Sequence, residues 1–107
     1  MKVLDLLDEY YLSFEYNNLR AETKAQYKYF LGIVCSTSVV GGKELGSYKL
    51  SSLTTKIAKL SYNKWCERGV SFANHLMSVT RVVLNYGINM EHCVQNVFSN
   101  IKKRTTA

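Results

Sequence analysis

The sequence predicts an all-α fold, a compact bundle of four main helices followed by a short helix near the C-terminus. Apolar residues recur at spacings of three and four along most of the chain, as they do on one face of an α-helix. Proline is absent from all 107 residues, which suits a chain of uninterrupted helices. A glycine-rich loop is expected between the second and third helices, where helical periodicity is lost.

The first helix is expected to end at the Asn17-Asn18 pair. Acidic residues in its early turns lie near the positive end of the helix dipole. Its exposed face is therefore acidic, and we expect that face to point away from any polyanion. The predicted buried stripe, at spacings of three, four and three, consists of Leu4, Leu7, Tyr11 and Phe14.

A second helix is predicted to begin within residues 21–23, because Thr23 and Gln26 have the spacing of a capping box. Thr23, Lys24 and Lys28 are candidate phosphate contacts, since a helix N-terminus offers free backbone N–H groups to an anion. A plain capped helix with solvated lysines is the alternative for these residues. The predicted buried stripe consists of Tyr27, Phe30, Leu31 and Val34.

A loop is predicted between Ser36 and Ser52, and it can contain a small hairpin that turns at Gly41-Gly42. A third helix follows, with Ser52 or Thr54 as its N-cap and Gly69 at its end. Its exposed lysines include Lys56 and Lys59, and such a charged helix face usually serves solubility. The residues expected to point inward are Leu53, Ile57, Leu60 and Trp65.

The central helix is predicted over residues 70–86, with an apolar stripe that must be buried: Phe72, Leu76, Val79, Val83 and Tyr86. The opposite stripe is small and polar around one arginine: Ser71, Asn74, Ser78, Arg81 and Asn85. No acidic residue occurs between Glu67 and Glu91, so nothing on this stripe repels a phosphate. Such side chains can read base edges and phosphates, although a surface helix that merely lacks acids has the same pattern.

Gly87 either caps the central helix or lies inside it at a close contact. A short helix is predicted around residues 91–98, and it leads into a basic tail that contains Lys102, Lys103 and Arg104. We therefore expect one helical domain over residues 1–101 and a basic linker over residues 102–107.

The positive charge is distributed unevenly along the chain, which has a net charge of +6. Residues 1–22 carry two basic and five acidic side chains, whereas residues 23–107 carry twelve basic and three acidic ones. A domain with a nucleic-acid face and an opposite acidic face has this asymmetry. Anionic membranes and acidic proteins are the other partners that it fits.

Cysteine and histidine usage predicts neither disulfides nor a metal site. Cys35, Cys66 and Cys93 are odd in number and far apart, so free thiols are expected. His75 and His92 form no metal-binding motif, and no cofactor is predicted. No apolar run reaches the roughly 18 residues that cross a membrane, and no signal peptide is recognisable, so we expect the chain to stay inside the cell.

The order of these features resembles the core-binding domain of phage-type tyrosine recombinases, the SAM-like helical domain that precedes the catalytic domain of integrases. The resemblance covers nearly the whole chain. In its first half it consists of the acidic helix, Thr23-x-x-x-Tyr27-x-x-x-Leu31, the glycine-bearing loop, and a helix from Leu53-Thr54 to Gly69. In its second half it consists of Ala73, Leu76, Asn85-Tyr86-Gly87-Ile88, and Asn96-Val97-Phe98 before basic residues.

The resemblance implies a DNA-binding module that clamps duplex DNA together with a catalytic domain of the same full-length chain, in a bacterial cell or phage-infected host. Other recombinase protomers are further expected partners. The catalytic arginine, lysine, histidine and tyrosine of that family lie in the other domain, so none of the eight tyrosines here is expected to be the nucleophile. The residues implied to face DNA are Thr23, Lys24, Lys28, Ser71, Asn74, Ser78 and Arg81, with Lys56 and Lys59 as weaker candidates.

One departure from the family concerns the last helix, which in the family exits through Asn-Pro followed by an apolar residue. This chain has Asn96-Val97-Phe98 there, so the exit is expected to be less sharply fixed.

Two other functions compete with DNA binding. A helical SAM-like interaction domain would bind an acidic protein, and a small enzyme is the poorest alternative because no catalytic constellation is present.

Overall fold

Two short helices form the N-terminal part of the chain in the computed structural model, which describes residues 1–105. Helix α1 spans Val3–Tyr11 and helix α2 spans Phe14–Asn17. The Ser13 hydroxyl accepts a hydrogen bond from the Tyr16 N–H at 3.1 Å, and so it caps α2. The prediction of one continuous helix is therefore wrong, because this serine starts a new helix two residues after α1 ends.

The buried face of α1 is also rotated from the predicted stripe. Leu4 is 47% exposed and Phe14 is 78% exposed, so two of the four predicted residues face solvent. The sequence offers a second set at helical spacing, and packing against α5 and η1 (Leu45–Ser47) selects that set. The buried residues of α1 are Val3, Leu6, Leu7 and Tyr10.

Helix α3 spans Ala21–Ser36, and its N-cap is Arg20, whose side chain makes no capping hydrogen bond. The predicted capping box is therefore wrong, since Thr23 already lies within the first turn. The Tyr16 hydroxyl instead donates to the Lys24 carbonyl at 3.0 Å and ties α2 to this turn. The predicted stripe is confirmed in its second half, where Leu31 and Val34 are buried, and it is half-buried before that.

The loop after α3 contains the small hairpin that the sequence allowed. Strands β1 (Ser38–Val40) and β2 (Lys43–Glu44) pair antiparallel, with Ser38 opposite Glu44. Gly41 and Gly42 have φ values of 60° and 73°, as a tight two-residue turn requires. The 3₁₀ turns η1 and η2 (Leu50–Ser52) complete the connection.

Helix α4 spans Thr55–Cys66, and Thr54 caps it by accepting from the Ile57 N–H at 3.2 Å. Of the residues expected inside, Leu53 and Trp65 are buried, whereas Ile57 and Leu60 are half-buried. The Trp65 indole donates to the Thr37 hydroxyl at 2.9 Å, which joins the end of α4 to the residue after α3. A polar indole N–H is thus satisfied inside the core.

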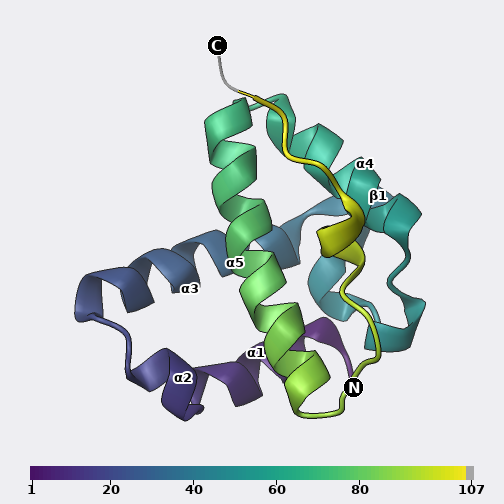
Figure 1. Cartoon of the computed structure of the whole chain (residues 1–107). Helices are drawn as coiled ribbons and strands as arrows, with labels where there is room; N and C mark the ends of the chain where they lie inside the picture. The colour runs from purple at the N-terminus through teal and green to yellow at the C-terminus, as the bar shows by residue number, and fades with distance from the viewer. Residues whose placement is uncertain (106–107) are drawn as a thin grey trace.

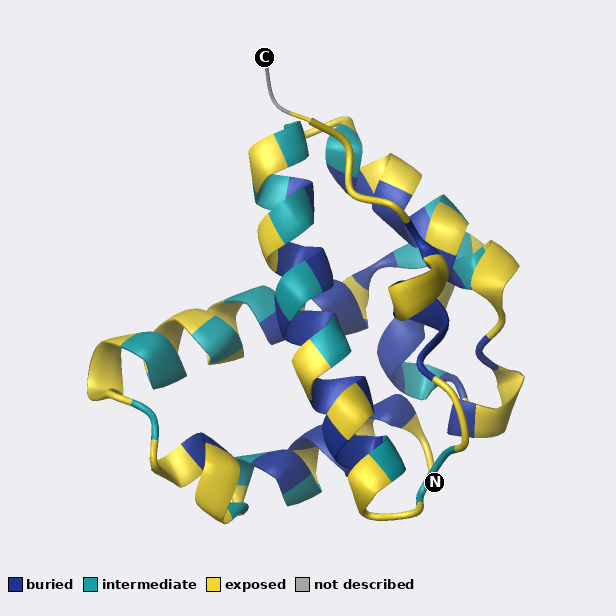
Figure 2. Cartoon of the chain, in the orientation of Figure 1, coloured by how far each residue is buried: buried dark blue, intermediate teal, exposed yellow. Residues whose placement is uncertain are grey.

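Helix α5 (Val70–Asn89) is the central element, and it crosses in front of α3 (Figure 1). Buried positions lie along α5 where the other elements pack on it (Figure 2). The predicted stripe is confirmed, because Phe72 is half-buried and the other four members are buried. Gly87 lies inside the helix, where a Cβ atom would be only 3.0 Å from the Leu6 side chain. The close contact is therefore the reason for glycine there.

The chain after α5 is not a helix over residues 91–96, so the predicted short helix is wrong. Glu91 has a φ of 63°, which ends the helical path, and the 3₁₀ turn η3 covers only Val97–Asn100. The segment then continues along α4 toward the C-terminus (Figure 1). The cause is tertiary in part, because the Asn96 amide donates to the Arg81 carbonyl and to Asn85 on α5. Its Oδ1 also caps η3 locally by accepting from the Phe98 N–H.

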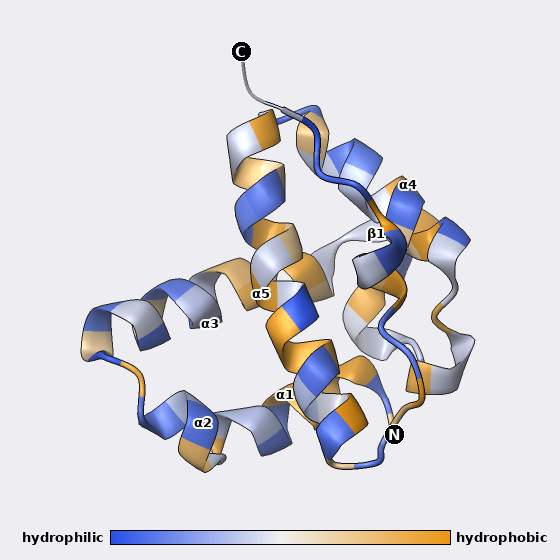
Figure 3. Cartoon of the chain, in the orientation of Figure 1, coloured by the Kyte–Doolittle hydropathy of each residue, from blue (hydrophilic) through white to orange (hydrophobic). Residues whose placement is uncertain are grey.

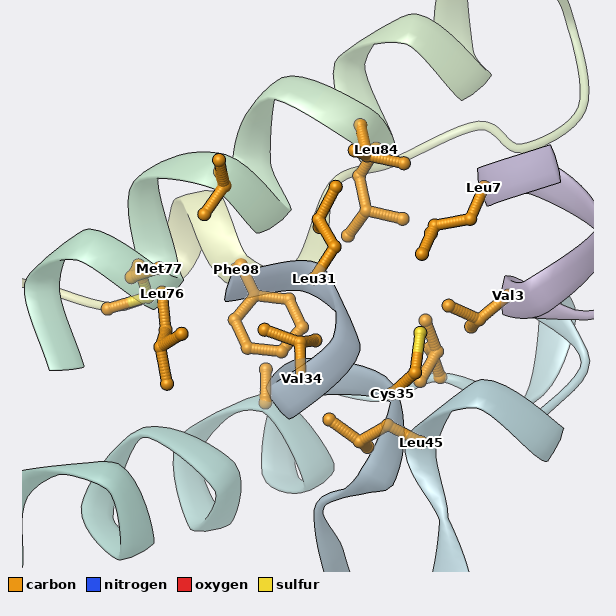
Figure 4. Close-up of a cluster of buried hydrophobic side chains, with 14 of the residues drawn as sticks. Val3, Leu7, Leu31, Val34, Cys35, Leu45, Leu76, Met77, Leu84 and Phe98 are labelled. Carbon is orange, nitrogen blue, oxygen red and sulfur yellow. The ribbon is translucent and has the colours of Figure 1, made fainter. Parts of the chain in front are cut away.

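The main core lies between α1, α3, α4 and α5 and is closed by η1 and η3. Leu31, Val34 and Cys35 of α3 lie near Leu45 and Phe98 in the close-up view (Figure 4). The Phe98 ring stacks on Trp65, with ring centroids 5.8 Å apart. Within residues 1–105, none of the helices combines the length and the apolar character needed to cross a bilayer.

Candidate nucleic-acid interface

The polar stripe of α5 faces the C-terminal segment of the same chain over part of its length. The Arg81 guanidinium donates from Nε to the Phe98 carbonyl at 3.0 Å and from Nη2 to the Ile101 carbonyl. The Asn96 amide donates back to the Arg81 carbonyl at 3.0 Å and to Asn85 Oδ1 at 3.0 Å. Arg81 therefore uses two of its donors on backbone carbonyls of its own chain.

These bonds also correct the expectation that the exit of the last helix is loosely fixed. Asn96 is only 7% exposed, and its side chain makes three hydrogen bonds without a proline at the next position. The turn after it is thus held by side-chain bonds to α5.

Two residues of the polar stripe nearer the N-terminus of α5, Asn74 and Ser78, bind the tail. Lys103 Nζ donates to the Ser78 hydroxyl, and Asn74 Nδ2 donates to the Arg104 carbonyl at 3.1 Å. Of the predicted stripe, Ser71 and Asn85 are exposed, while Asn74, Ser78 and Arg81 are half-buried. The stripe is a hydrogen-bonding surface, as its composition predicts, and the chain's own backbone and tail occupy its middle.

The tail lies along α4 and brings two groups of cations together. Asn100 Nδ2 donates to Thr55 Oγ1 at 3.4 Å, and Arg104 Nη2 donates to Asn63 Oδ1 at 2.8 Å. Lys59 lies between Thr55 and Asn63 at spacings of four, so it shares their helix face. Figure 3 shows the hydrophilic tail beside α4. We call the resulting surface, all of it exposed, the α4–tail surface: Lys56, Lys59, Lys102, Lys103 and Arg104.

The charges of the α4–tail surface are not neutralised by carboxylates of the chain. Helix α4 contains no acidic residue, and Glu67 follows it only at the C-cap. Among the residues that the structure describes, no lysine or arginine is within ion-pair distance of a carboxylate. Five like charges on neighbouring segments repel one another, and a bound polyanion would relieve this repulsion.

The candidates on α3 lie apart from this surface. The first half of α3 projects away from α5 on one side, whereas α4 and the tail lie on the other side (Figure 1). Thr23 and Lys24 are half-buried, and the exposed Lys28 places Nζ 5.1 Å from the centre of the Tyr11 ring. The structure therefore separates the residues expected to face DNA into two groups, because all three predicted phosphate contacts lie on α3.

The acidic helix α1 uses one of its carboxylates for an internal contact that the sequence did not reveal. Glu9 Oε2 lies 2.8 Å from His92 Nε2, and Glu9 Oε2 also accepts from the Tyr86 hydroxyl at 3.0 Å. The hydrogen bond from His92 is the main cause that lowers the pKa of Glu9. More than 75 positions separate Glu9 from either partner, so no local spacing could have indicated the contact.

The cysteines are free, as predicted, with Cys35 buried and the other two half-buried. Burial raises the pKa of Cys35 to about 11 and also raises the pKa of Cys93, so neither is an activated thiolate. Within residues 1–105, no three histidine, cysteine or acidic side chains gather as a possible metal site.

Comparison of the chain with family models, with curated proteins and with solved structures finds no match.

Proposed function

We propose that this chain is a DNA-binding domain and that the α4–tail surface holds the phosphates of duplex DNA. The single observation that supports this function most strongly is that five exposed cations, without a carboxylate partner among the described residues, lie on two segments that hydrogen bonds hold side by side. Phosphate neutralisation by lysine and arginine supplies most of the affinity in sequence-independent DNA binding.

The dimensions of the surface suit one strand of a duplex. Thr55 and Asn63, which mark the two ends of the tail contact, are eight residues apart, or about 12 Å along the helix. One DNA strand carries roughly three to four phosphates over that axial length. Because Lys59 lies inside this interval and the tail runs beside it, cations from both segments can reach consecutive phosphates.

In this proposal the polar stripe of α5 has a supporting role. Arg81, Asn74 and Ser78 hold the segment that carries the tail cations, so they affect DNA through that segment. Ser71 and the α3 group of Thr23, Lys24 and Lys28 would contribute only secondary contacts.

We further propose that the domain is the SAM-like core-binding module of a tyrosine recombinase, which is the setting implied by the resemblance in residue order. The remaining residues of the expected linker beyond Thr105 lie outside the described part of the chain. The coding sequence that follows residue 107 decides this point. A catalytic domain with the arginine, lysine, histidine and tyrosine set would support the recombinase setting, and a stop codon there would refute it.

The test of DNA binding is a salt titration with a duplex of about 20 base pairs, followed by fluorescence anisotropy. If three to five of the cations meet phosphates, log K should fall against log salt with a slope of about −2.7 to −4.5, since each phosphate contributes about −0.9. A polyglutamate chain of equal charge serves as the control for an acidic protein partner. Tighter binding of polyglutamate than of the duplex would overturn the proposal in favour of a protein-interaction domain.

A further inference from the structure

We infer that Tyr62 and Asn74 are positioning residues that fix the tail in its DNA-binding arrangement. This inference rests on the proposed function, because it assigns these two side chains to the same α4–tail surface. Neither residue contributes a charge to that surface, and Tyr62 is only 2% exposed. Their effect on DNA must therefore pass through the residues that they hold.

The side chains of Tyr62 and Asn74 together bind the backbone of one tail residue, Arg104. The Arg104 N–H donates to the Tyr62 hydroxyl at 2.7 Å, and the same hydroxyl donates to Asn74 Oδ1 at 2.6 Å. The Asn74 amide completes the ring by donating to the Arg104 carbonyl at 3.1 Å. Both backbone polar groups of Arg104 are thus bound by side chains from α4 and α5, far from it in sequence.

These bonds engage only the backbone of Arg104, and its exposed side chain lies along α4. The guanidinium lies 5.8 Å from the centre of the Tyr62 ring and donates to Asn63. Lys103, one residue earlier, is held to α5 through Ser78. Two successive cations therefore have defined positions, although they belong to a segment without regular secondary structure.

A fixed tail should bind DNA more tightly than a free tail of the same charge. A free tail must be ordered when it binds, and that ordering subtracts from the affinity, whereas a docked tail has already lost the freedom. Loss of the Tyr62 hydroxyl removes two bonds of the ring and keeps the aromatic packing. We therefore expect Tyr62→Phe to weaken duplex binding about three- to tenfold.

The test compares Tyr62→Phe with Tyr16→Phe in the full chain. Tyr16 is a matched control, because its hydroxyl also bonds to a backbone group, the Lys24 carbonyl, but lies at the α2–α3 contact. Amide hydrogen exchange at Arg104, measured by NMR, shows whether its backbone N–H is hydrogen-bonded, and the measurement needs no DNA. We expect Tyr62→Phe to speed this exchange at least tenfold and to weaken duplex binding, whereas Tyr16→Phe should change neither.

A double-variant comparison separates positioning from general stability. In a background in which Lys102, Lys103 and Arg104 are all alanine, Tyr62→Phe should have no further effect on duplex affinity. An undiminished effect in that background would overturn the inference, as would unchanged Arg104 exchange. A third outcome separates this inference from the proposed function. If Tyr62→Phe speeds amide exchange at Arg104 but the unaltered chain does not bind duplex DNA, then Tyr62 does hold the Arg104 backbone. In that case both the proposed function and the positioning role are wrong.

Discussion

The polar stripe of α5 and the α4–tail surface differ in what they contact, although both are rich in donors and poor in acids. Arg81 on the stripe donates to two backbone carbonyls of the C-terminal segment. Lys56 and Lys59 on α4 are exposed and have no carboxylate partner among the described residues. Composition therefore predicts that a helix face forms hydrogen bonds, but the partner depends on which segment folds over it.

The largest expected effect concerns the two faces of α5. Leu76 is fully buried, so Leu76→Ala should lower the free energy of unfolding by about 2–5 kcal/mol through lost contacts and a cavity. Ser71→Ala, on the exposed end of the polar stripe, should change it by less than about 0.5 kcal/mol. Urea unfolding measures both. A larger effect at Ser71 than at Leu76 would mean that α5 is rotated and that its polar stripe faces the core.

A smaller effect distinguishes the stripe from the α4–tail surface. Arg81→Ala leaves the Phe98 and Ile101 carbonyls without their charged donor, so it should destabilise the fold by about 1.5–3 kcal/mol. Lys59→Ala removes an exposed cation and should stay within about 0.5 kcal/mol. The same urea experiment compares them. Equal, small effects would show that the Arg81 bonds do not hold the C-terminal segment.

The smallest expected effect extends the comparison to the acidic helix α1. The pKa of Glu9 is lowered in the folded chain by its hydrogen bond from His92, so its stabilising contribution is complete above the ordinary pKa of a glutamate and is lost as pH falls through the folded pKa. Glu9→Gln should therefore be less stable than the unaltered chain at pH 6, and the gap should shrink by pH 3. Thermal unfolding at both pH values measures the gap, with the exposed Asp8→Asn as control. A gap that does not change with pH would contradict the Glu9 contact.

Local sequence signals predicted the elements whose boundaries depend on local chemistry. Thr54 was one of two predicted caps for α4, and Gly41-Gly42 marked the hairpin turn. The stripe from Phe72 to Tyr86 predicted the buried face of α5, because a 20-residue helix repeats its pattern often enough to be read. Helix α1 is only nine residues long, so two apolar sets had similar spacing there, and tertiary packing decided between them.

The errors near the C-terminus have a different cause. The path of residues 91–104 depends on the bonds of Asn96 to α5 and of Arg104 to Tyr62, and these partners are far away in sequence. Sequence reasoning therefore identified Lys56, Lys59 and Arg81 as candidates, but it could not tell that Arg81 faces the chain's own backbone. Hydrogen bonds of Lys103 and Arg104 also dock part of the expected linker, residues 102–107, on the helical domain.

A salt titration of paired lysine variants shows which surface of the domain binds duplex DNA. Lys56→Ala with Lys59→Ala and Lys24→Ala with Lys28→Ala remove equal charge from α4 and from α3, respectively. We expect the α4 pair to make the salt slope of duplex binding shallower by about two, and the α3 pair to leave it nearly unchanged. A shallower slope for the α3 pair, with the α4 pair unchanged, would contradict the claim that the α4–tail surface holds the DNA.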